Sequence, residues 1–332
     1  MSTKLHGDTR GVRPPARLGR ILAAFVLIAV CGIAPVSSRL AAINLVILGQ
    51  KPSYGPTSIS DVPNLAAIDR LIWAPGLDEG WDPQGLAIAD GNLLVSAYRS
   101  NGMWANRGPC RVFRVDTETG TETGHFDVPP PCGHAGGLAY AGGGKLFIAD
   151  PHTLFEVNLD RAFSEPSPQV RIFPLGPGVK GAFAVSGEEE IWIGDYETER
   201  AGEILEYIVN RLESLPDGAT VSKTIAAARR EIQSYGQGGA IRSGKLWISR
   251  SDLGWGFLDK LDAVTDRVES RYAVAAGVEG IAFDGAGRLW CLSEAGARHL
   301  PWRYPFFPVI FRLDPARLSP ADQTESAVTL EP

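Results

Sequence analysis

The chain has 332 residues, and its 38 glycines and 24 prolines indicate many turns and few long helices. Hydrophobic residues make up 44% of it and charged residues 21%, which excludes both a disordered chain and a multi-pass membrane protein. The net charge is −6, but residues 1–20 hold five basic residues and one acidic residue, so they carry +4 and the remainder carries −10. An acidic body argues against nucleic acid as a partner, because phosphates need a basic face.

The first 38 residues have the order of a signal peptide or of an uncleaved membrane anchor. Basic residues precede residues 21–36, which carry no charge, and small residues follow them. Residues 40–48 are again mostly apolar, so an uncleaved helix would extend over residues 21–48 and contact the membrane there. Both alternatives place the body in the periplasm or outside the cell, and the second anchors it in the inner membrane. Residues 39–66 are interpreted as a linker.

Two of the four cysteines flank a predicted hairpin. Cys110 precedes and Cys132 follows two alternating segments that are joined by a turn near Gly120. If the hairpin forms, the two thiols lie close enough for a disulfide, which an oxidising compartment would favour. The alternative is a pair of free thiols. Cys291 has the sequence context of a small buried hydrophobic residue.

From residue 84 onward the sequence repeats five times. Each copy opens with a glycine and a short apolar strand, continues through a turn into a second strand rich in β-branched and aromatic residues, and then reaches a third. The aligned glycines are Gly85, Gly137, Gly181, Gly239 and Gly280. Four antiparallel strands per repeat predict an all-β fold, a β-propeller over residues 67–318, with a tail over residues 319–332. Five blades are counted, and a sixth is left open.

The fifth copy has no clear fourth strand of its own. Residues 68–73, ahead of the first glycine, have the pattern of the missing strand, so we expect one blade to combine both ends of the chain and to close the ring. The aligned glycines are expected where strands approach closely at the axis. A recurring aromatic residue in the second strand is expected to pack between blades, as Phe147, Trp192, Trp247 and Trp290.

The repeat alignment also predicts which residues surround one mouth of the central channel. In a propeller, the loop that leads into each first strand and the loop that follows each second strand emerge on the same face. Polar side chains occupy these positions, as a site for a small ligand requires. We expect the ligand-binding residues to be Gln84, His134, Asp150, Lys180, Asp195, Gln237, Arg250 and Glu279. Tyr98 and Glu294 hold further positions on this face. The alternative is that these polar groups only keep the face soluble.

Two long loops on this face carry a methionine and several aromatic side chains suited to capping a ligand: Met103, Trp104, Trp302, Tyr304, Phe306 and Phe307. His134 and His152, with Asp150 nearby, have the chemistry of metal ligands, although a solvated or hydrogen-bonded pair explains them more simply. No serine has the context of a nucleophile elbow, and no phosphate-binding P-loop is present.

Residues 67–316 resemble the propellers of the NHL repeat and SMP-30/gluconolactonase group. The resemblance rests on the rhythm of Gln84-Gly85-Leu86-Ala87 and its following strand, and on Glu279-Gly280, which is similar to a Glu-Gly element of the lactonase family. It implies a calcium ion at the channel mouth, held here by Glu279 with Asp150 and Asp195, and a six-bladed calcium-dependent enzyme. The chain departs from that pattern at Lys180, where an ammonium group would stand near the metal.

The leading hypothesis is therefore an exported or membrane-tethered propeller that binds a polar small molecule or glycan at the face of Lys180 and Glu279. In this hypothesis the protein uses no cofactor and does not convert the ligand into a product. The first alternative is a calcium-dependent hydrolase of lactones or esters, so whether the protein is an enzyme is left open. The second is a scaffold for a partner protein of the cell envelope, bound through residues 302–307.

Overall fold

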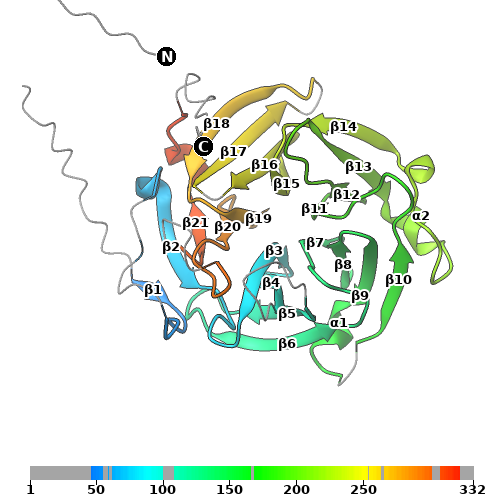
Figure 1. Ribbon diagram of the computed structural model, residues 1–332, viewed down its shortest axis with the longest axis horizontal. Coiled ribbons are helices and arrows are strands. Elements are labelled where there is room, and N and C mark those ends of the chain that lie inside the picture. The colour runs from blue at the N-terminus through cyan, green and yellow to red at the C-terminus, as the bar shows by residue number, and fades with distance from the viewer. Residues whose placement is uncertain are drawn as a thin grey trace, which may run out of the picture. The chain divides into compact units, whose positions relative to one another are not determined.

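A computed structural model describes residues 46–54, 59, 62–99, 108–165, 168–252, 254–262, 265–300 and 307–321. All of them belong to one compact unit, Ile43–Pro332. Within this described part of the chain, the strands form five sheets that stand as blades around a common axis (Figure 1). The predicted all-β propeller with five blades is confirmed.

Four of the blades have four antiparallel strands each, in chain order from the axis outward (Figure 1). The first holds β3 (Trp81–Ala89), β4 (Asn92–Arg99), β5 (Cys110–Val115) and β6 (Glu122–Val128). The second holds β7 (Gly137–Tyr140), β8 (Lys145–Asp150), β9 (Thr153–Asn158) and β10 (Val170–Pro174). The third holds β11 (Phe183–Ser186), β12 (Glu190–Gly194), β13 (Gly202–Ile208) and β14 (Ala228–Ile232). The fourth holds β15 (Gly236–Arg242), β16 (Lys245–Asp252), β17 (Trp255–Asp262) and β18 (Val268–Val274).

The fifth blade combines strands from both ends of the described chain. It holds β19 (Val278–Phe283), β20 (Leu289–Ser293), β21 (Val309–Leu313), β2 (Ile68–Trp73) and β1 (Ile47–Leu48). Strand β2 pairs antiparallel with β21, and β1 pairs parallel with β2. Short helical turns lie between strands: η1 (Leu65–Ala67), α1 (Leu159–Ala162), α2 (Val209–Glu213), η2 (Lys223–Ile225) and η3 (Pro315–Arg317).

The predicted extension of an apolar helix to residue 48 is wrong at its end. Ile47 and Leu48 pair with Leu71 and Ile72, so their backbone groups belong to a sheet. Residues 1–45, which include the predicted leader or anchor, lie outside the described residues, as do residues 322–332 of the predicted tail. None of the helices in the described part of the chain is both long and apolar enough to cross a membrane.

The hydrophobic core is distributed over the seams between blades. The four recurring aromatic residues are all buried, and each clusters with residues of the next blade. Phe147 packs in one cluster with Ile191 and Leu205, and Trp192 packs in another with Ile248. The expectation that these side chains pack between blades is confirmed. Cys291 is also fully buried, as predicted.

Glycines permit the five inner strands to meet at the axis. The strands β3, β7, β11, β15 and β19 contact one another in a closed ring. A Cβ atom on Gly85 would lie 2.9 Å from Cα of Gly137, and one on Gly238 would lie 3.0 Å from Cα of Gly280. A Cβ on Gly280 would lie 2.7 Å from the carbonyl carbon of Gly85 and closer still to the nitrogen of Leu86. Any larger residue would push neighbouring blades apart.

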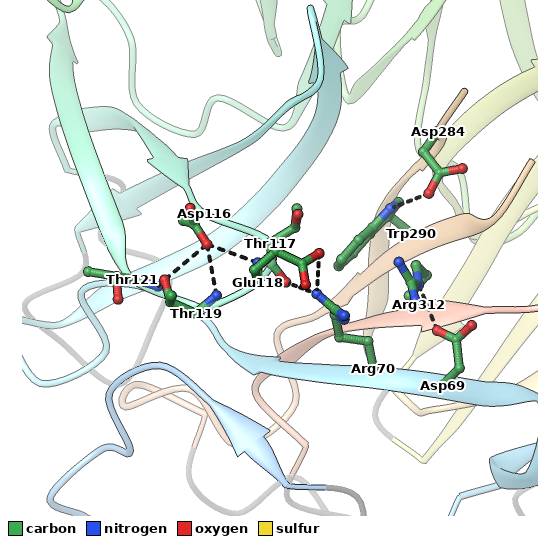
Figure 2. Close-up of polar contacts among 10 residues, drawn as sticks. All are labelled: Asp69, Arg70, Asp116, Thr117, Glu118, Thr119, Thr121, Asp284, Trp290 and Arg312. Carbon is green, nitrogen blue, oxygen red and sulfur yellow. Dashed lines mark hydrogen bonds and ion pairs between the residues drawn. The ribbon is translucent and has the colours of Figure 1, made fainter. Parts of the chain in front are cut away.

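Polar contacts reinforce the seam between the fifth and first blades. Figure 2 shows Arg70 of β2 reaching the turn between β5 and β6, where it donates to the Thr117 carbonyl and lies 2.7 Å from the Glu118 carboxylate. Asp116 shapes that turn by accepting the backbone N–H of Thr119 at 2.8 Å (Figure 2). The fifth blade is thereby joined to the first at its outer strands as well as at the axis.

A carboxylate or amide caps the end of the third strand in four blades. Asn158 accepts the N–H of Arg161, Asp262 that of Thr265 and Asp314 that of Ala316, in the manner of Asp116. These side chains satisfy N–H groups that the turn would otherwise leave without an acceptor. The repeat therefore includes a turn signal that the sequence analysis did not use.

The predicted disulfide between Cys110 and Cys132 is confirmed. Their Cα atoms are 5.9 Å apart and 22 residues separate them in sequence. Cys110 pairs across the hairpin with Val128, so Cys132 lies beyond the end of β6 and not opposite Cys110 in the ladder. The bond therefore fixes the loop that leads from the first blade into the second.

Substituting alanine at the axis should destabilise the propeller. We expect Gly280→Ala to lower the free energy of unfolding by about 2 kcal/mol or more, because its Cβ overlaps the backbone of β3. Gly285→Ala is the matched control, since a Cβ at Gly285 meets no atom within 4 Å. Chemical denaturation of both variants measures the difference, and equal stability would contradict the proposed packing at the axis.

Candidate functional site

One end of the central channel is apolar and the other is polar. Near the apolar end, a small void of about 90 Å³ is lined by side chains such as Leu86, Ile241 and Phe283 of the inner strands. At the opposite end, the first strands begin and the second strands end, and buried polar residues replace apolar ones. We call this end the mouth.

Three buried polar side chains belong to the mouth where the fifth blade adjoins the first. Gln84 donates from its amide nitrogen to the Glu294 carboxylate at 2.8 Å and to the Pro83 carbonyl at 2.9 Å. Glu279 precedes Gly280 on β19 as Gln84 precedes Gly85 on β3, so the two hold equivalent positions on touching strands. The exposed fractions are 2% for Gln84, 3% for Glu279 and 7% for Glu294. Sequence reasoning thus placed Gln84 and Glu279 correctly in the repeat.

A chain of titratable groups continues from this cluster along the mouth. The imidazole Nδ1 of His299 pairs with the buried carboxylate of Asp82, and its Nε2 lies 3.0 Å from the Tyr98 hydroxyl. The Tyr98 ring is tilted against the His134 ring at 5.0 Å between centroids. Because His299 follows β20, Asp82 and Tyr98 belong to the first blade and His134 precedes the second, the chain connects three blades.

Sequence reasoning missed Asp82 and His299. Asp82 lies only two residues before Gln84, so the repeat alignment contained a signal for it. His299 had none, because the segment that follows β20 has no counterpart of similar sequence in the other copies. Its place beside Asp82 follows from the contact between the fifth and first blades, which closes the ring.

The N-terminal segment also reaches this region. The backbone N–H and hydroxyl of Ser53 donate to the Asp78 carboxylate at 2.8 and 2.7 Å. Burial raises the pKa of the adjacent Tyr54 hydroxyl, and the charges of Asp82 and Asp78 raise it further. The segment between β1 and β2 therefore lies close enough to Asp82 for that charge to affect the ionisation of Tyr54.

Asp150 stabilises the loop that precedes the second blade. One oxygen of its carboxylate accepts the backbone N–H groups of Gly133, His134 and Ala135 at 3.1, 2.6 and 3.0 Å. The disulfide lies beside it, with Cys132 Sγ 3.6 Å away. Asp150 and the disulfide together hold the loop that presents His134.

The predicted residues of the third blade form their own cluster. Lys180 pairs with Glu197 at 2.9 Å, and Arg200 pairs with the same carboxylate at 2.5 Å. The hydrogen bond from Lys180 is the main cause that lowers the pKa of Glu197. Asp195 accepts the N–H of Glu203 at 2.5 Å, and burial raises its pKa. Lys180 is therefore engaged within its own blade, and its ion pair is not with Glu279.

Arg250 is likewise engaged within the fourth blade. It lies 3.1 Å from the buried Asp259 carboxylate and donates to the Ser234 carbonyl at 2.6 Å. Arg271 pairs with the same carboxylate at 2.6 Å. Gln237 lies 3.5 Å from the Ser251 hydroxyl. Of the eight predicted residues, the structure therefore gathers Gln84, His134 and Glu279 around the contacts of the fifth, first and second blades.

The calcium ligands that the family resemblance implies do not assemble. Within the described residues, one group of three potential metal ligands lies within 4.8 Å, and it consists of Cys110, Cys132 and Asp150. Its sulfur atoms are joined in the disulfide, so they offer no thiolate. Glu279, Asp150 and Asp195 belong to three different blades and do not form such a group. These residues do not fit a calcium ion.

Phe307 does not cap a ligand. It is fully buried and packs against Phe311 with 5.5 Å between ring centroids, so it belongs to the core of the fifth blade. The expectation that it caps the mouth is wrong because its apolar surface is covered by that core. The other predicted capping residues lie outside the described residues: Met103, Trp104, Trp302, Tyr304 and Phe306.

A cavity of about 690 Å³ lies along the seam of the fifth and first blades, and its lining extends from Asp78 and Trp81, at the start of β3, to the turn between β5 and β6. Trp73 and Trp81 line it, but these indoles are only 5% and 4% exposed, and Arg111 covers the Trp81 ring at 4.7 Å. The indoles therefore offer little surface on which a ligand could stack. We place the candidate site at the mouth, where polar side chains from several blades converge.

No protein-family model matches the chain, and no curated protein matches it. Several solved structures are similar to it at low identity. The PQQ-bound aldose sugar dehydrogenase of Streptomyces coelicolor is 12% identical over 80% of this chain and 99% of that one, with a TM-score of 0.42. The calcium-binding protein regucalcin of Agrobacterium tumefaciens is 13% identical over 70% and 89%, with a TM-score of 0.38. Hydrazine synthase of Kuenenia stuttgartiensis is 13% identical, with a TM-score of 0.37 over 73% of this chain, which spans 58% of that one. Similarities at this level identify neither a family nor a function.

The stability of the propeller should depend on pH through Asp195. Because burial raises its pKa in the folded state, its carboxylate opposes folding as pH rises through that pKa. Asp195→Asn should therefore increase the free energy of unfolding at pH 7, and the gain should disappear at acidic pH. Glu197→Gln is the control. The pKa of Glu197 is lowered in the folded state, so its carboxylate stabilises the fold at pH values above that pKa, and the substitution should lower the free energy of unfolding at pH 7. Urea titrations from pH 3 to 7 test both, and a destabilised Asp195→Asn at pH 7 would contradict the argument.

Proposed function

We propose that the protein is an exported, soluble or membrane-tethered propeller that binds an uncharged polyhydroxy compound, such as a sugar, at the mouth. The observation that carries the proposal is the buried hydrogen bond between Gln84 and Glu294, beside Glu279, where two blades meet. A carboxylate oxygen accepts more than one hydrogen bond, so these groups can accept from the hydroxyl groups of a ligand in addition to the contacts they already make. A ligand rich in hydroxyl groups supplies such donors.

The charges around the mouth favour a neutral ligand over an anionic one. The cationic groups predicted for this face, Lys180 and Arg250, are engaged by Glu197 and Asp259. The carboxylates buried at the contact of the fifth and first blades are those of Asp82, Glu279 and Glu294, and an ionised carboxylate acts only as an acceptor. A sugar acid would meet these carboxylates with a charge of the same sign.

Export is proposed from the N-terminal sequence and is compatible with the disulfide. Disulfides persist in oxidising compartments and are rare in the cytosol. The Cys110–Cys132 bond holds the loop of His134, so the oxidising compartment would also preserve the geometry of the mouth.

Binding should be lost when the mouth carboxylates are neutralised. We expect neutral monosaccharides to bind the full chain in calorimetric titrations, and Glu294→Gln or Glu279→Gln to weaken binding about tenfold or more, since each removes a charged acceptor. Glu197→Gln is the matched control, because it removes a carboxylate of the third blade that pairs with Lys180. Binding of sugar acids but not of neutral sugars, or equal affinity in all three variants, would contradict the proposal.

The oxidation state of the cysteines should show whether the chain is exported. Alkylation of the denatured, unreduced protein should label only Cys291 among the three cysteines that follow residue 38. Deleting residues 1–38 should retain the chain in the cytoplasm and should expose Cys110 and Cys132 to labelling as well. Fractionation of cells that make either chain provides the independent measure of location. An intact disulfide in a cytoplasmic deletion variant would argue against the export proposal.

A further inference from the structure

The cavity along the seam of the fifth and first blades has the size of a ligand site. Its volume is about 690 Å³, and pockets for small molecules usually enclose about 300–1,000 Å³. Three parts of the chain line it: residues 49–52, the connection between β2 and β3, and the first blade from β5 to β6. Charged side chains of both signs belong to the lining, among them Asp78, Glu79 and Arg111. The carboxylates that meet at the mouth offer acceptors alone, whereas the cavity offers a cation as well.

The segment that follows β1 is fixed against both blades and forms one wall of the cavity. Its Gly49 N–H donates to the Thr119 carbonyl of the first blade at 3.2 Å. The two backbones approach so closely there that a Cβ atom on Gly49 would lie 2.7 Å from the carbonyl oxygen of Gly120. Further along, the N–H of Ser53 donates to the Asp78 carboxylate at 2.8 Å. The wall is therefore held at both ends, as a pre-formed ligand site requires.

Arg111 supplies a cation that its own contacts satisfy only in part. Its Nε and Nη2 atoms donate to the Asp127 carboxylate at 2.6 and 3.2 Å, and its Cζ lies 4.7 Å from the centroid of the Trp81 ring. A guanidinium group has five N–H donors, and the two on Nη1 make no hydrogen bond to any of the described residues. The Asp127 side chain is 63% exposed, so water screens this ion pair. Arg111 therefore retains donors for a carboxylate in the cavity.

Glu79 supplies an anion near the same indole. It lies two residues before Trp81, a separation of at most about 7 Å along the chain, and Arg111 lies over that ring. The Glu79 side chain is exposed, and it makes no ion pair or hydrogen bond within the described part of the chain. Beside it, Asp78 uses one carboxylate oxygen, Oδ1, for both donors of Ser53, which leaves Oδ2 for another donor. Opposite charges thus line one cavity without pairing with each other.

A ligand of a single charge suits this lining less well. An anion would meet Asp78, Glu79 and Glu122 with a charge of the same sign, and a cation would meet Arg111. Glu122 also pairs at 2.6 Å with His125, which belongs to the same strand. A ligand that carries one ammonium and one carboxylate has no net charge and provides a partner for each sign.

We propose that this cavity is a second binding site, for a zwitterionic amino acid or short peptide. Arg111 receives the carboxylate through Nη1, and Glu79 with Asp78 receives the ammonium group. Free amino acids and short peptides share this chemistry, and the probes below distinguish them. The site is separate from the mouth and does not depend on the binding of a sugar there.

The test uses three peptides that differ only at their ends. Calorimetric titration of the full chain with trialanine measures the affinity for the zwitterion. N-acetyl-trialanine lacks the ammonium group, and trialanine amide lacks the carboxylate. We expect trialanine to bind and each blocked peptide to bind about tenfold more weakly or worse, since each has lost one charged hydrogen bond. Free alanine, titrated in the same way, shows whether a single amino acid is sufficient.

Each assigned contact should disappear from its own comparison. Glu79→Gln should bring the affinity for trialanine down to that for N-acetyl-trialanine and preserve the discrimination against the amide. Arg111→Gln should do the reverse. A merely structural role would lower the affinity for all three peptides alike. Because the Glu79 side chain is exposed, Glu79→Gln remains informative if Arg111→Gln fails to fold.

Arg114→Gln is the matched control for Arg111. Arg114 lies on the same strand, β5, and its Cζ lies 4.6 Å from the centroid of the Phe163 ring, but it does not line the cavity. Glu188→Gln is the control for Glu79, because Glu188 is an exposed glutamate in the turn between β11 and β12. Both variants should keep the affinity for trialanine.

The outcomes separate this site from the mouth. Glu294→Gln should leave the affinity for trialanine unchanged, and a loss there would overturn the placement in the cavity. Failure of both trialanine and alanine to bind overturns the proposal and leaves the sugar site untouched. Equal affinity for trialanine and its two blocked forms also overturns it, because charge would then play no part in recognition.

Discussion

The close approach of five inner strands at the axis is the constraint on which the rest of the molecule depends. Gly85, Gly137, Gly238 and Gly280 let the backbones of neighbouring blades touch, and side chains cannot be inserted there without separating the blades. A narrow axis places the starts of β3 and β19 side by side. Gln84 and Glu279, each directly ahead of a glycine, are therefore brought to one point although 195 residues separate them.

The polar groups of the face divide into those that complete a blade and those that converge on the mouth. Asp150, Lys180 and Arg250 find partners within or beside their own blades, and their hydrogen bonds order loops. Gln84 and His299 find partners across a blade boundary. A contact across a boundary depends on ring closure, so the chemistry of the mouth is available only in the completed propeller.

Repetition made the architecture predictable from the sequence, while the site depends on what does not repeat. The second-strand aromatics and the polar positions recur in each copy, so their places follow from a single alignment. The alignment of the glycines is one residue off in the fourth copy, where Gly238 and not Gly239 meets Gly280 at the axis. The alignment cannot decide whether Lys180 reaches the mouth or pairs with Glu197, because that depends on side-chain direction within the third blade. His299 lies outside the repeat altogether, and only the spatial contact of the last blade with the first reveals its partner Asp82.

The composite fifth blade has a consequence for how the chain is made. Arg312 of β21 pairs with Asp69 of β2, and 243 residues separate them in sequence (Figure 2). During synthesis β2 emerges early, and its partner β21 is made only after the four other blades. The apolar side chains of β2 stay uncovered by β21 during that interval, so the fifth blade is assembled after the others have been synthesised.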